Sequence, residues 1–424
     1  MNVLKKTKVF KRGLVLMGLT AFIFTSCEKE ETEGPVVEKE PVELGCNYFN
    51  EDRVLENDPE RPVDYIISCN MVIRGSKVEV EPGTVIDFTE KGGIELYNDS
   101  EGYLIAKGTA EEPIVFKGTN SQKGHWRGIQ ISNDNSNNEL SYVKIQDAGR
   151  DNRPALRVNL NAHLILKNSE IFNNSNTGLS VFTATPFGGV DDGAYAVVIE
   201  NNKVYDNKRP VAVHLQNVGN ISSSNDFSGN EVDEIFVETG NSSGYQITQD
   251  VTWQAHEQPY ILEGGGVHLF AKLTIEPGAV LKFDLDQKLE LHPPSGGRGT
   301  GEIYAVGTAE KSIIFTSIED IPKYWAGIIV NSDHPSNEIG HATIENTGNE
   351  DTGSRWEQGN VVLSNASHKL NIHDVTFKSM NTRFCAVRGP ATTSNIAISG
   401  PEGVEGGGCA HNPDHRRGNN DYDM

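Results

Sequence analysis

The chain has 424 residues, of which 37 are basic and 59 are acidic, so its net charge is −22 at pH 7. This excess of acidic residues argues against general electrostatic attraction as a way to bind nucleic acid or an anionic polysaccharide. Hydrophobic residues make up 36% of the chain and glycine is plentiful, which favours a structure with many turns. The length suffices for two domains or for one long solenoid.

The first 26 residues have the pattern of a signal peptide. The basic residues near the start, with no acidic residue among them, are Lys5, Lys6, Lys8, Lys11 and Arg12. Residues 13–25 (GLVLMGLTAFIFT) are almost wholly apolar and too few to span a bilayer. We therefore expect residues 1–26 to be removed on export. The mature chain then has 32 basic against 59 acidic residues, a net charge of −27.

The next residues resemble the lipobox of bacterial lipoproteins. Thr25 and Ser26 precede Cys27, and Phe24 stands where the usual pattern has leucine, a variation found in lipoproteins of the Bacteroidota type. The resemblance implies cleavage before Cys27 and a diacylglycerol on its thiol, which would anchor the chain to a membrane. The alternative is an ordinary secretory signal followed by an incidental cysteine.

An acidic segment follows the cysteine. Residues 28–45 hold seven glutamates, two lysines and two prolines, too few apolar groups to fold, so we expect residues 27–45 to be an extended tether. Residues 28–31 (EKEE) resemble the signal that sends Bacteroidota lipoproteins to the outer face of the outer membrane, which implies a surface-exposed outer-membrane protein. A solvated run of charges is the alternative interpretation.

The remaining four cysteines fall in two pairs, at spacings of 23 and 24 residues: Cys46 with Cys69, and Cys385 with Cys409. An oxidising compartment permits disulfides, which would clamp both ends of a fold. Zinc sites need closely spaced ligand pairs such as C-x2-C, and the sequence has none. We therefore predict disulfides.

An internal repeat governs the architecture. Three motifs return later in the chain: residues 78–88 (VEVEPGTVIDF) as 273–283 (LTIEPGAVLKF), 108–111 (GTAE) as 307–310 (GTAE), and 126–129 (WRGI) as 325–328 (WAGI). The offset is 195 for the first and 199 for the other two. A register held over about 110 residues indicates duplication.

Within each half, apolar and polar residues alternate over three to five positions, and Gly, Asn, Asp and Ser clusters separate these runs. This pattern predicts short strands, and no sustained helical period follows the leader. Residues 164–174 (LILKNSEIFNN) and 197–207 (VVIENNKVYDN) share a further signature, in which an apolar strand meets an asparagine turn.

These features resemble the right-handed parallel β-helix, the pectate-lyase-like solenoid, over about residues 64–400. The three repeated motifs are similar to those of uncharacterised β-helix lipoproteins from Bacteroidota. The resemblance implies an all-β solenoid with stacked asparagines at its turns, built from two duplicated halves. Stacking rungs at about 4.8 Å would pair the strand edges and bury the apolar faces. A pair of β-sandwiches is the structural alternative.

The predicted organisation has five parts: signal peptide 1–26, tether 27–45, first half 46–249, second half 250–410 and a flexible tail 411–424. Residues 249–266 restart the motif of the first half, so one body with a seam near residue 250 and two separate solenoids both remain open. His411 and His415 could bind a metal only on a helix, which the tail composition does not favour.

The sequence offers little for catalysis. β-Helix enzymes mostly cleave acidic polysaccharides through calcium-binding acids and an Arg or Lys base. Only fragments of their motifs occur, at Asp191-Asp192, at Gly340-His341-Ala342 and at Lys378-Ser379. Asp284 and Asp286, if they alternate along a strand, could offer one face to Ca²⁺; solvated outer residues are the other interpretation. We assign no catalytic residue, metal ligand or cofactor.

Aromatic residues give the candidate ligand contacts. Trp126 and Trp325 hold the same repeat position and are expected in the core. Two longer loops could emerge on a binding face, or be plain surface connections. Their candidate ligand-binding residues are Trp356 and Arg355 in residues 349–358, and Phe187, Asp191 and Asp192 in residues 183–193.

These observations favour a lipid-anchored, non-catalytic surface module that binds a glycan or an envelope protein and no nucleic acid. The alternative is a Ca²⁺-dependent polysaccharide lyase or glycoside hydrolase.

Overall fold

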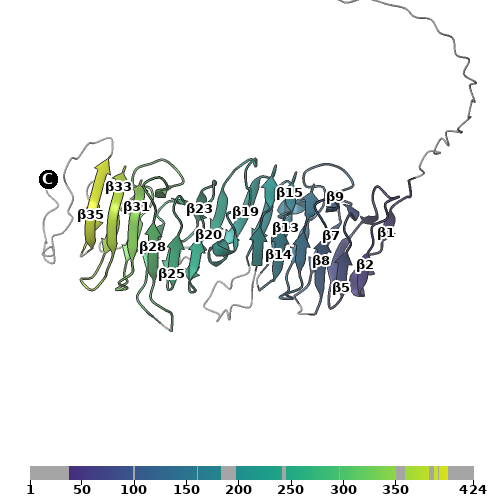
Figure 1. Cartoon of the computed structure of the whole chain (residues 1–424), viewed down its shortest axis with the longest axis horizontal. Coiled ribbons are helices and arrows are strands. Elements are labelled where there is room, and N and C mark those ends of the chain that lie inside the picture. Colours follow the sequence, from purple (N-terminus) through teal and green to yellow (C-terminus); the bar gives the residue numbers. More distant parts are fainter. Residues whose placement is uncertain are drawn as a thin grey trace, which may run out of the picture. The chain divides into compact units, whose positions relative to one another are not determined.

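The computed structural model describes residues 38–98, 101–159, 161–182, 197–240, 245–295, 297–349, 359–381, 386–389 and 391–399. Residues from Lys39 onward cluster as a compact unit. Its described part is all-β, and the strand pairings are parallel (Figure 1). The helical turns of this part are η1 (Tyr48–Asn50), η2 (Arg150–Asn152) and η3 (Leu215–Asn220). Among the described residues, no helix is long and apolar enough to cross a bilayer.

The strands form four sheets, which we number I to IV. Sheet I contains β1 (Val42–Leu44), β3 (Tyr65–Ile67), β6 (Val85–Phe88), β9 (Ile114–Gly118), β12 (Val143–Gln146), β15 (Glu170–Phe172) and β18 (Lys203–Tyr205). Sheet II contains β2 (Arg53–Leu55), β5 (Lys77–Val80), β8 (Tyr103–Lys107), β11 (Glu139–Ser141), β14 (Leu164–Lys167) and β17 (Val197–Glu200).

Sheet III contains strands of both halves. From the first half come β4 (Asn70–Ile73), β7 (Gly93–Leu96), β10 (Ile129–Ile131), β13 (Leu156–Val158), β16 (Thr177–Val181), β19 (Arg209–His214) and β20 (Ile235–Glu238). From the second half come β22 (Val251–Trp253), β23 (Tyr260–Glu263), β25 (Lys272–Ile275), β26 (Val280–Phe283), β28 (Glu302–Val306), β29 (Ile313–Ser317), β31 (Glu338–Glu345), β33 (Asn371–Lys378) and β35 (Thr392–Ser399). Sheet IV contains β21 (Tyr245–Ile247), β24 (Val267–Leu269), β27 (Lys288–Leu291), β30 (Gly327–Val330), β32 (Val361–Leu363) and β34 (Val387–Arg388).

Consecutive strands enter different sheets and then return. β3, β4 and β5 belong to sheets I, III and II, and β6 comes back to sheet I against β3, with Tyr65 opposite Ile86. Each strand therefore pairs with its counterpart one rung later, as a parallel crossover requires. This arrangement is compatible with the expected solenoid. Parallel pairing throughout the described strands contradicts the alternative of two β-sandwiches, whose sheets are antiparallel.

The buried core follows from the period-two pattern of the sequence. In β5 and β6 every second side chain is buried, so that Val78, Val80, Ile86 and Phe88 point inward. Equivalent positions on later rungs continue the same apolar column, and one hydrophobic cluster includes residues from Leu44 to Ala391. Each rung thus buries its apolar face against the next rung.

Asparagines stack at the turns, as the family resemblance implies. The side-chain amide of Asn174 donates to Asn207 Oδ1 at 2.8 Å, and that of Asn207 donates to Asn230 Oδ1 at 3.1 Å. Asn174 and Asn207 are fully buried. These amides satisfy polar groups inside the turns, since Asn207 also donates to the backbone carbonyl of Ile171 at 3.0 Å.

The two repeated tryptophans have equivalent surroundings. Trp126 stacks on Phe88 with ring centroids 4.0 Å apart, and its indole N–H donates to the carbonyl of Gln146. Trp325 stacks on Phe283 at 4.2 Å and donates to the carbonyl of Glu345. Both indoles are fully buried. The prediction that these tryptophans belong to the core is therefore confirmed.

Where the two halves meet, the strands equivalent to those of sheet I continue sheet III instead. β7 and β27 are equivalent in sequence, yet β7 lies in sheet III and β27 in sheet IV. Likewise β6 lies in sheet I, whereas its equivalent β26 lies in sheet III. We call residues 206–260 the seam, because sheets I and II end before it and sheet IV begins inside it.

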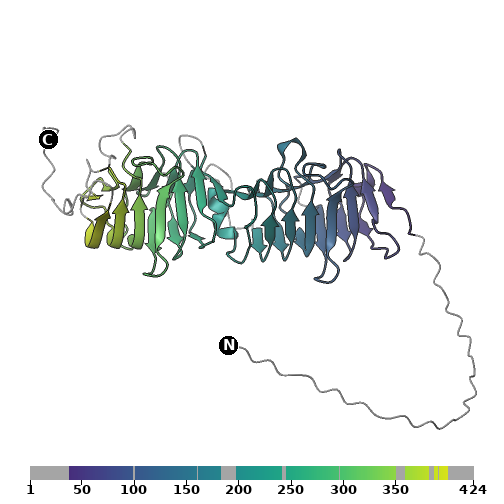
Figure 2. The same ribbon diagram turned by 90° about the horizontal axis from the view of Figure 1, so that it is seen from above.

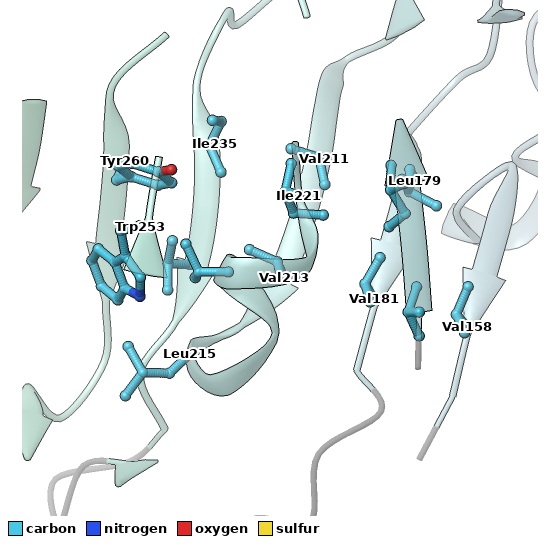
Figure 3. Packing of buried hydrophobic residues seen from close by; sticks show 14 of the residues in the cluster. Val158, Leu179, Val181, Val211, Val213, Leu215, Ile221, Ile235, Trp253 and Tyr260 are labelled. Carbon is cyan, nitrogen blue, oxygen red and sulfur yellow. The ribbon is translucent and has the colours of Figure 1, made fainter. Parts of the chain in front are cut away.

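Sheet III crosses the seam through β19, β20 and β23, with Val211 opposite Ile235 and Ile235 opposite Tyr260. Figure 3 shows the buried side chains at this crossing, where Trp253 lies near Tyr260 and the chain turns at η3. The ring centroids of Trp253 and Tyr260 are 5.4 Å apart. The helical turn η3 is visible in teal between the two stacks of arrows (Figure 2).

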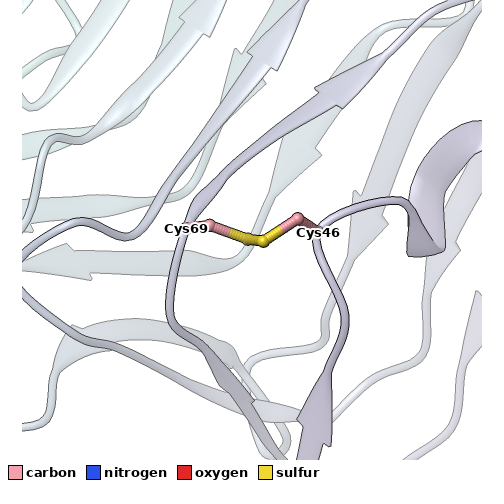
Figure 4. The surroundings of a disulfide bond; sticks show 2 residues. All are labelled: Cys46 and Cys69. Carbon is pink, nitrogen blue, oxygen red and sulfur yellow. A yellow bond between two sulfur atoms is a disulfide. The ribbon is translucent and has the colours of Figure 1, made fainter.

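The folded part begins earlier than the boundary predicted from composition. Val42–Leu44, placed in the tether by its acidic surroundings, forms β1 and pairs with β3, and Leu44 is buried. A disulfide joins Cys46, which follows β1, to Cys69, between β3 and β4 (Figure 4). Strand pairing and this covalent bond outweigh the unfavourable composition of residues 42–45.

Candidate binding sites on the strand faces

A cleft lined by three arginines lies on the solvent side of sheet III. Arg127 precedes β10, Arg153 follows η2 and Arg157 belongs to β13; they line the same cleft as Glu95 of β7. We call these four residues and their neighbours the arginine cleft. The other lining residues are Asn70, Ile94, Gly128, Ile129, Gln130 and Pro154.

The strand register brings these side chains together. Glu95 lies opposite Gln130 in the pairing of β7 with β10, and Gln130 lies opposite Arg157 in the pairing of β10 with β13. Paired positions point to the same face of a sheet, so the three side chains form one row. Gly128 holds the turn beside Arg127 at φ +105°, and a Cβ there would come within 2.5 Å of the Ala155 carbonyl oxygen. The turn therefore requires glycine.

Charge in the arginine cleft is unbalanced. Both carboxylate oxygens of Glu95 accept from amides, from Asn70 at 3.1 Å and from Gln130 at 3.3 Å. Within the described chain, none of the three arginines forms an ion pair, whereas Arg150 nearby pairs with Glu90 at 3.2 Å. The Nε–H of Arg127 is buried and has no hydrogen-bond partner among the described residues. An unsatisfied cationic donor beside two further guanidinium groups suits an anion.

A second cluster lies on sheet IV. His268 of β24 is opposite Glu290 of β27, and His292 follows β27 directly. His268 Nδ1 lies 2.8 Å from His292 Nε2, and Glu290 Oε2 lies 3.5 Å from the former nitrogen and 3.6 Å from the latter. We call these three residues the histidine-glutamate cluster.

Neighbouring groups fix the geometry of this cluster. Asn331 donates to Glu290 Oε1 at 2.9 Å, and Lys288 pairs with Oε2 at 2.7 Å. Burial lowers the pKa of His268 to about 4, although Glu290 opposes the shift. Burial of Glu290 works against its ionisation, but Lys288 and the two imidazoles hold the pKa of its carboxyl below the usual value. His268 is therefore a neutral imidazole at pH 7, beside a carboxylate.

A third group, at His341, His373 and Asp374, has different chemistry. His373 Nδ1 lies 2.8 Å from Asp374 Oδ2, and its Nε2 lies 3.1 Å from Glu338 Oε1. Hydrogen bonding to Asp374, then to Glu338, raises the pKa of His373 against the effect of burial. Both ring nitrogens face carboxylates, so this imidazole suits the role of a cationic partner in an ion pair.

The candidate residues predicted from sequence have mixed outcomes. The prediction that Asp284 and Asp286 alternate along a strand is wrong, because β26 ends at Phe283 and both lie in the following turn. There Asp284 accepts from Tyr324 at 3.4 Å and Asp286 accepts from Asn349. Several other candidates lie outside the described residues: Cys27, Phe187, Asp191, Asp192, Arg355, Trp356, Cys385, Cys409, His411 and His415.

Sequence reasoning missed both the arginine cleft and the histidine-glutamate cluster. The signal for the cluster was Glu290-Leu291-His292, two polar residues on one face of a strand, with His268 one rung earlier. Finding it required the rung register as well as the motif. No family model matches the chain, and neither the curated proteins nor the solved structures include a match.

Proposed function

We propose that this protein is an exported, lipid-anchored binding module without catalytic activity, which holds an acidic glycan in the arginine cleft. The scaffold would be a right-handed parallel β-helix, and the anchor would be Cys27 in the outer membrane. Support for the scaffold comes from the parallel sheets and the stacked asparagines. Support for the anchor comes from the leader and Cys27 alone.

One observation carries the choice of ligand. Three arginines that form no ion pair with the described carboxylates line one cleft on a chain whose net charge is −22. Guanidinium groups bind carboxylates and sulfates through paired N–H donors, and each charge-assisted hydrogen bond is worth about 1.5–3 kcal/mol when well formed. Charges more than about 8 Å away are largely screened at physiological ionic strength, so the local arginines outweigh the acidic surface.

The arrangement favours a polymer over a single anion. Arg127 lies beside one rung, whereas Arg153 and Arg157 belong to the next, and rungs of a parallel sheet are about 4.8 Å apart. Acidic groups on successive units of a glycan could meet arginines on successive rungs.

The test measures binding of the full chain to polyuronate and sulfated oligosaccharides, with a neutral glucan as a reference. Arg127→Gln, Arg153→Gln and Arg157→Gln should each weaken binding about fivefold, the effect of about 1 kcal/mol, and the triple variant should abolish it. Arg150→Gln is the matched control, because that arginine is paired with Glu90 and does not line the cleft. Equal affinities for wild type and triple variant would reject the arginine cleft as the site.

The same sample tests the two remaining parts of the proposal. Incubation with polyuronate, with and without Ca²⁺, should release no product; accumulation of unsaturated or reducing ends would overturn the non-catalytic assignment. Palmitate labelling in cells should mark the wild type and spare Cys27→Ala. Equal labelling of both would remove the anchor from the proposal.

A further inference from the structure

The histidine-glutamate cluster has the donor set of a transition-metal site. Two imidazole nitrogens and one carboxylate oxygen bind Zn²⁺ in several enzymes and related ions elsewhere. Ligands of a tetrahedral ion at about 2.0–2.1 Å lie about 3.3 Å apart. The separations here, 2.8, 3.5 and 3.6 Å, are close to that value. We propose that His268, Glu290 and His292 bind one divalent transition ion of the zinc class.

The surroundings hold the three donors in place without an ion. The ring of His292 stacks on Phe270 at 4.5 Å with planes 6° apart, and Arg298 lies over the same phenylalanine. The second oxygen of Glu290 is held by Asn331. Contacts of this kind orient metal ligands, and their loss typically weakens binding 10- to 100-fold. The exposed fractions of the side chains are 14% for His268, 8% for Glu290 and 23% for His292, so an ion could enter from solvent.

Lys288 is the competitor for the ion. Its ammonium lies 2.7 Å from Glu290 Oε2, the oxygen that faces both imidazoles. An incoming cation would take over this carboxylate oxygen, and the lysine, with 23% of its side chain exposed, would turn to solvent. Removing the lysine charge should therefore strengthen metal binding, whereas removing any of the three donors should weaken it.

The third group serves as an internal comparison. His341, His373 and Asp374 also place three donor atoms within 4.8 Å of one another. His373, however, faces a carboxylate with each ring nitrogen, so a metal would have to displace a charge-assisted hydrogen bond there, whereas in the histidine-glutamate cluster it would displace the 2.8 Å hydrogen bond between the two imidazoles. His373 is the matched control for the metal ligands. Like His268 it belongs to a strand of a parallel sheet, but its strand, β33, lies in sheet III and not in sheet IV.

The experiment titrates the full chain with Zn²⁺ by calorimetry and with Co²⁺ by visible absorption. We expect one ion per chain, with an intense d–d spectrum and no thiolate charge-transfer band. His268→Asn, Glu290→Gln and His292→Asn should each weaken binding at least tenfold, Lys288→Gln should strengthen it several-fold, and His373→Asn should leave it unchanged.

Circular dichroism shows whether each variant has folded. If a donor variant does not fold, Lys288→Gln still tests the proposal. A metal affinity of Lys288→Gln that is weaker than or equal to that of the wild type would contradict the proposal. Absence of stoichiometric binding, or an equal loss from His373→Asn, would overturn it. Glycan binding in the arginine cleft is measured separately, so either proposal can fail without the other.

Discussion

Glu95 and Glu290 occupy the same position in the two duplicated halves, on β7 and β27, and have acquired different partners. In the first half the carboxylate accepts from Gln130 on the next strand, and Arg157 lies opposite Gln130 on the strand after that. In the second half it faces imidazoles, and the following strands present Ile329 and Val362, both fully buried. The inward positions of the two halves are therefore alike, whereas their outward positions differ.

Inward conservation is clearest at the stacked aromatic pairs. Trp126→Ala and Trp325→Ala should each lower the free energy of unfolding by about 4 kcal/mol, because a fully buried indole is removed and its contact with Phe88 or Phe283 is lost. Urea denaturation followed by circular dichroism measures the loss, and hydrogen exchange shows which half opens. Ile321→Ala is the control, since that side chain is 52% exposed. A loss below about 1 kcal/mol for one tryptophan alone would break the equivalence of the halves.

The outer end of the first half is held covalently. The Cys46–Cys69 disulfide closes a loop of 23 residues. Replacing both cysteines by serine should cost about 3 kcal/mol, because the unfolded chain regains loop entropy. Hydrogen exchange in β1 and η1 should rise, while exchange in β23 and β26 should stay as in the wild type. Uniformly faster exchange would mean that this rung supports the whole stack.

The seam should respond to acid before either half. His214 is buried there and His256 is half-buried, and burial lowers the pKa of each to about 4 from an ordinary value of 6.5. The unfolded chain therefore binds protons first on acidification, so the stabilisation is complete above pH 6.5 and falls as the pH drops toward 4. Between pH 7 and pH 5.5 the loss should be about 2.5 kcal/mol for the two groups together.

His256→Phe provides the test of this assignment. The ring lies between Phe227 and Tyr260, with centroids 5.8 and 5.7 Å away, so phenylalanine should fit and remove one titration. The pH dependence of unfolding should fall by about half. If the pH dependence of unfolding were the same in His256→Phe as in the wild type, His256 would not be a source of the acid sensitivity.

The side chains that point into the core could be predicted from the sequence, because period-two alternation and the repeated motifs indicate directly which positions are buried. Strand positions such as β5, β6 and β9, and the core role of Trp126, follow from those patterns. The change of sheet between equivalent strands of the two halves could not be predicted. The sequence repeat relates β7 to β27, but it does not tell which strands each of them pairs with. The residues inserted at the seam decide this pairing.

The candidate sites depend on the same missing information. Arg127, Arg153 and Arg157 converge because of loop lengths between rungs, which vary along the chain: Val42 pairs with Tyr65, whereas Ile171 pairs with Val204. A fixed rung length inferred from the family would have misplaced them. The aromatic residues proposed as ligand contacts lie in loops outside the described residues, so those predictions stand untested.

The same substitution at the equivalent positions Glu95 and Glu290 should have opposite effects on ligand binding. Glu95→Gln keeps an amide oxygen for Asn70 but removes a negative charge from the cleft that three arginines line, so acidic glycan should bind about fivefold more tightly, a change of about 1 kcal/mol. Glu290→Gln removes a ligand and should weaken metal binding without affecting glycan. Calorimetry with both ligands on both variants measures the four affinities. If Glu95→Gln weakened glycan binding instead, the carboxylate would be a hydrogen-bond acceptor for sugar hydroxyls, and the arginines would have to be reassigned to orienting it.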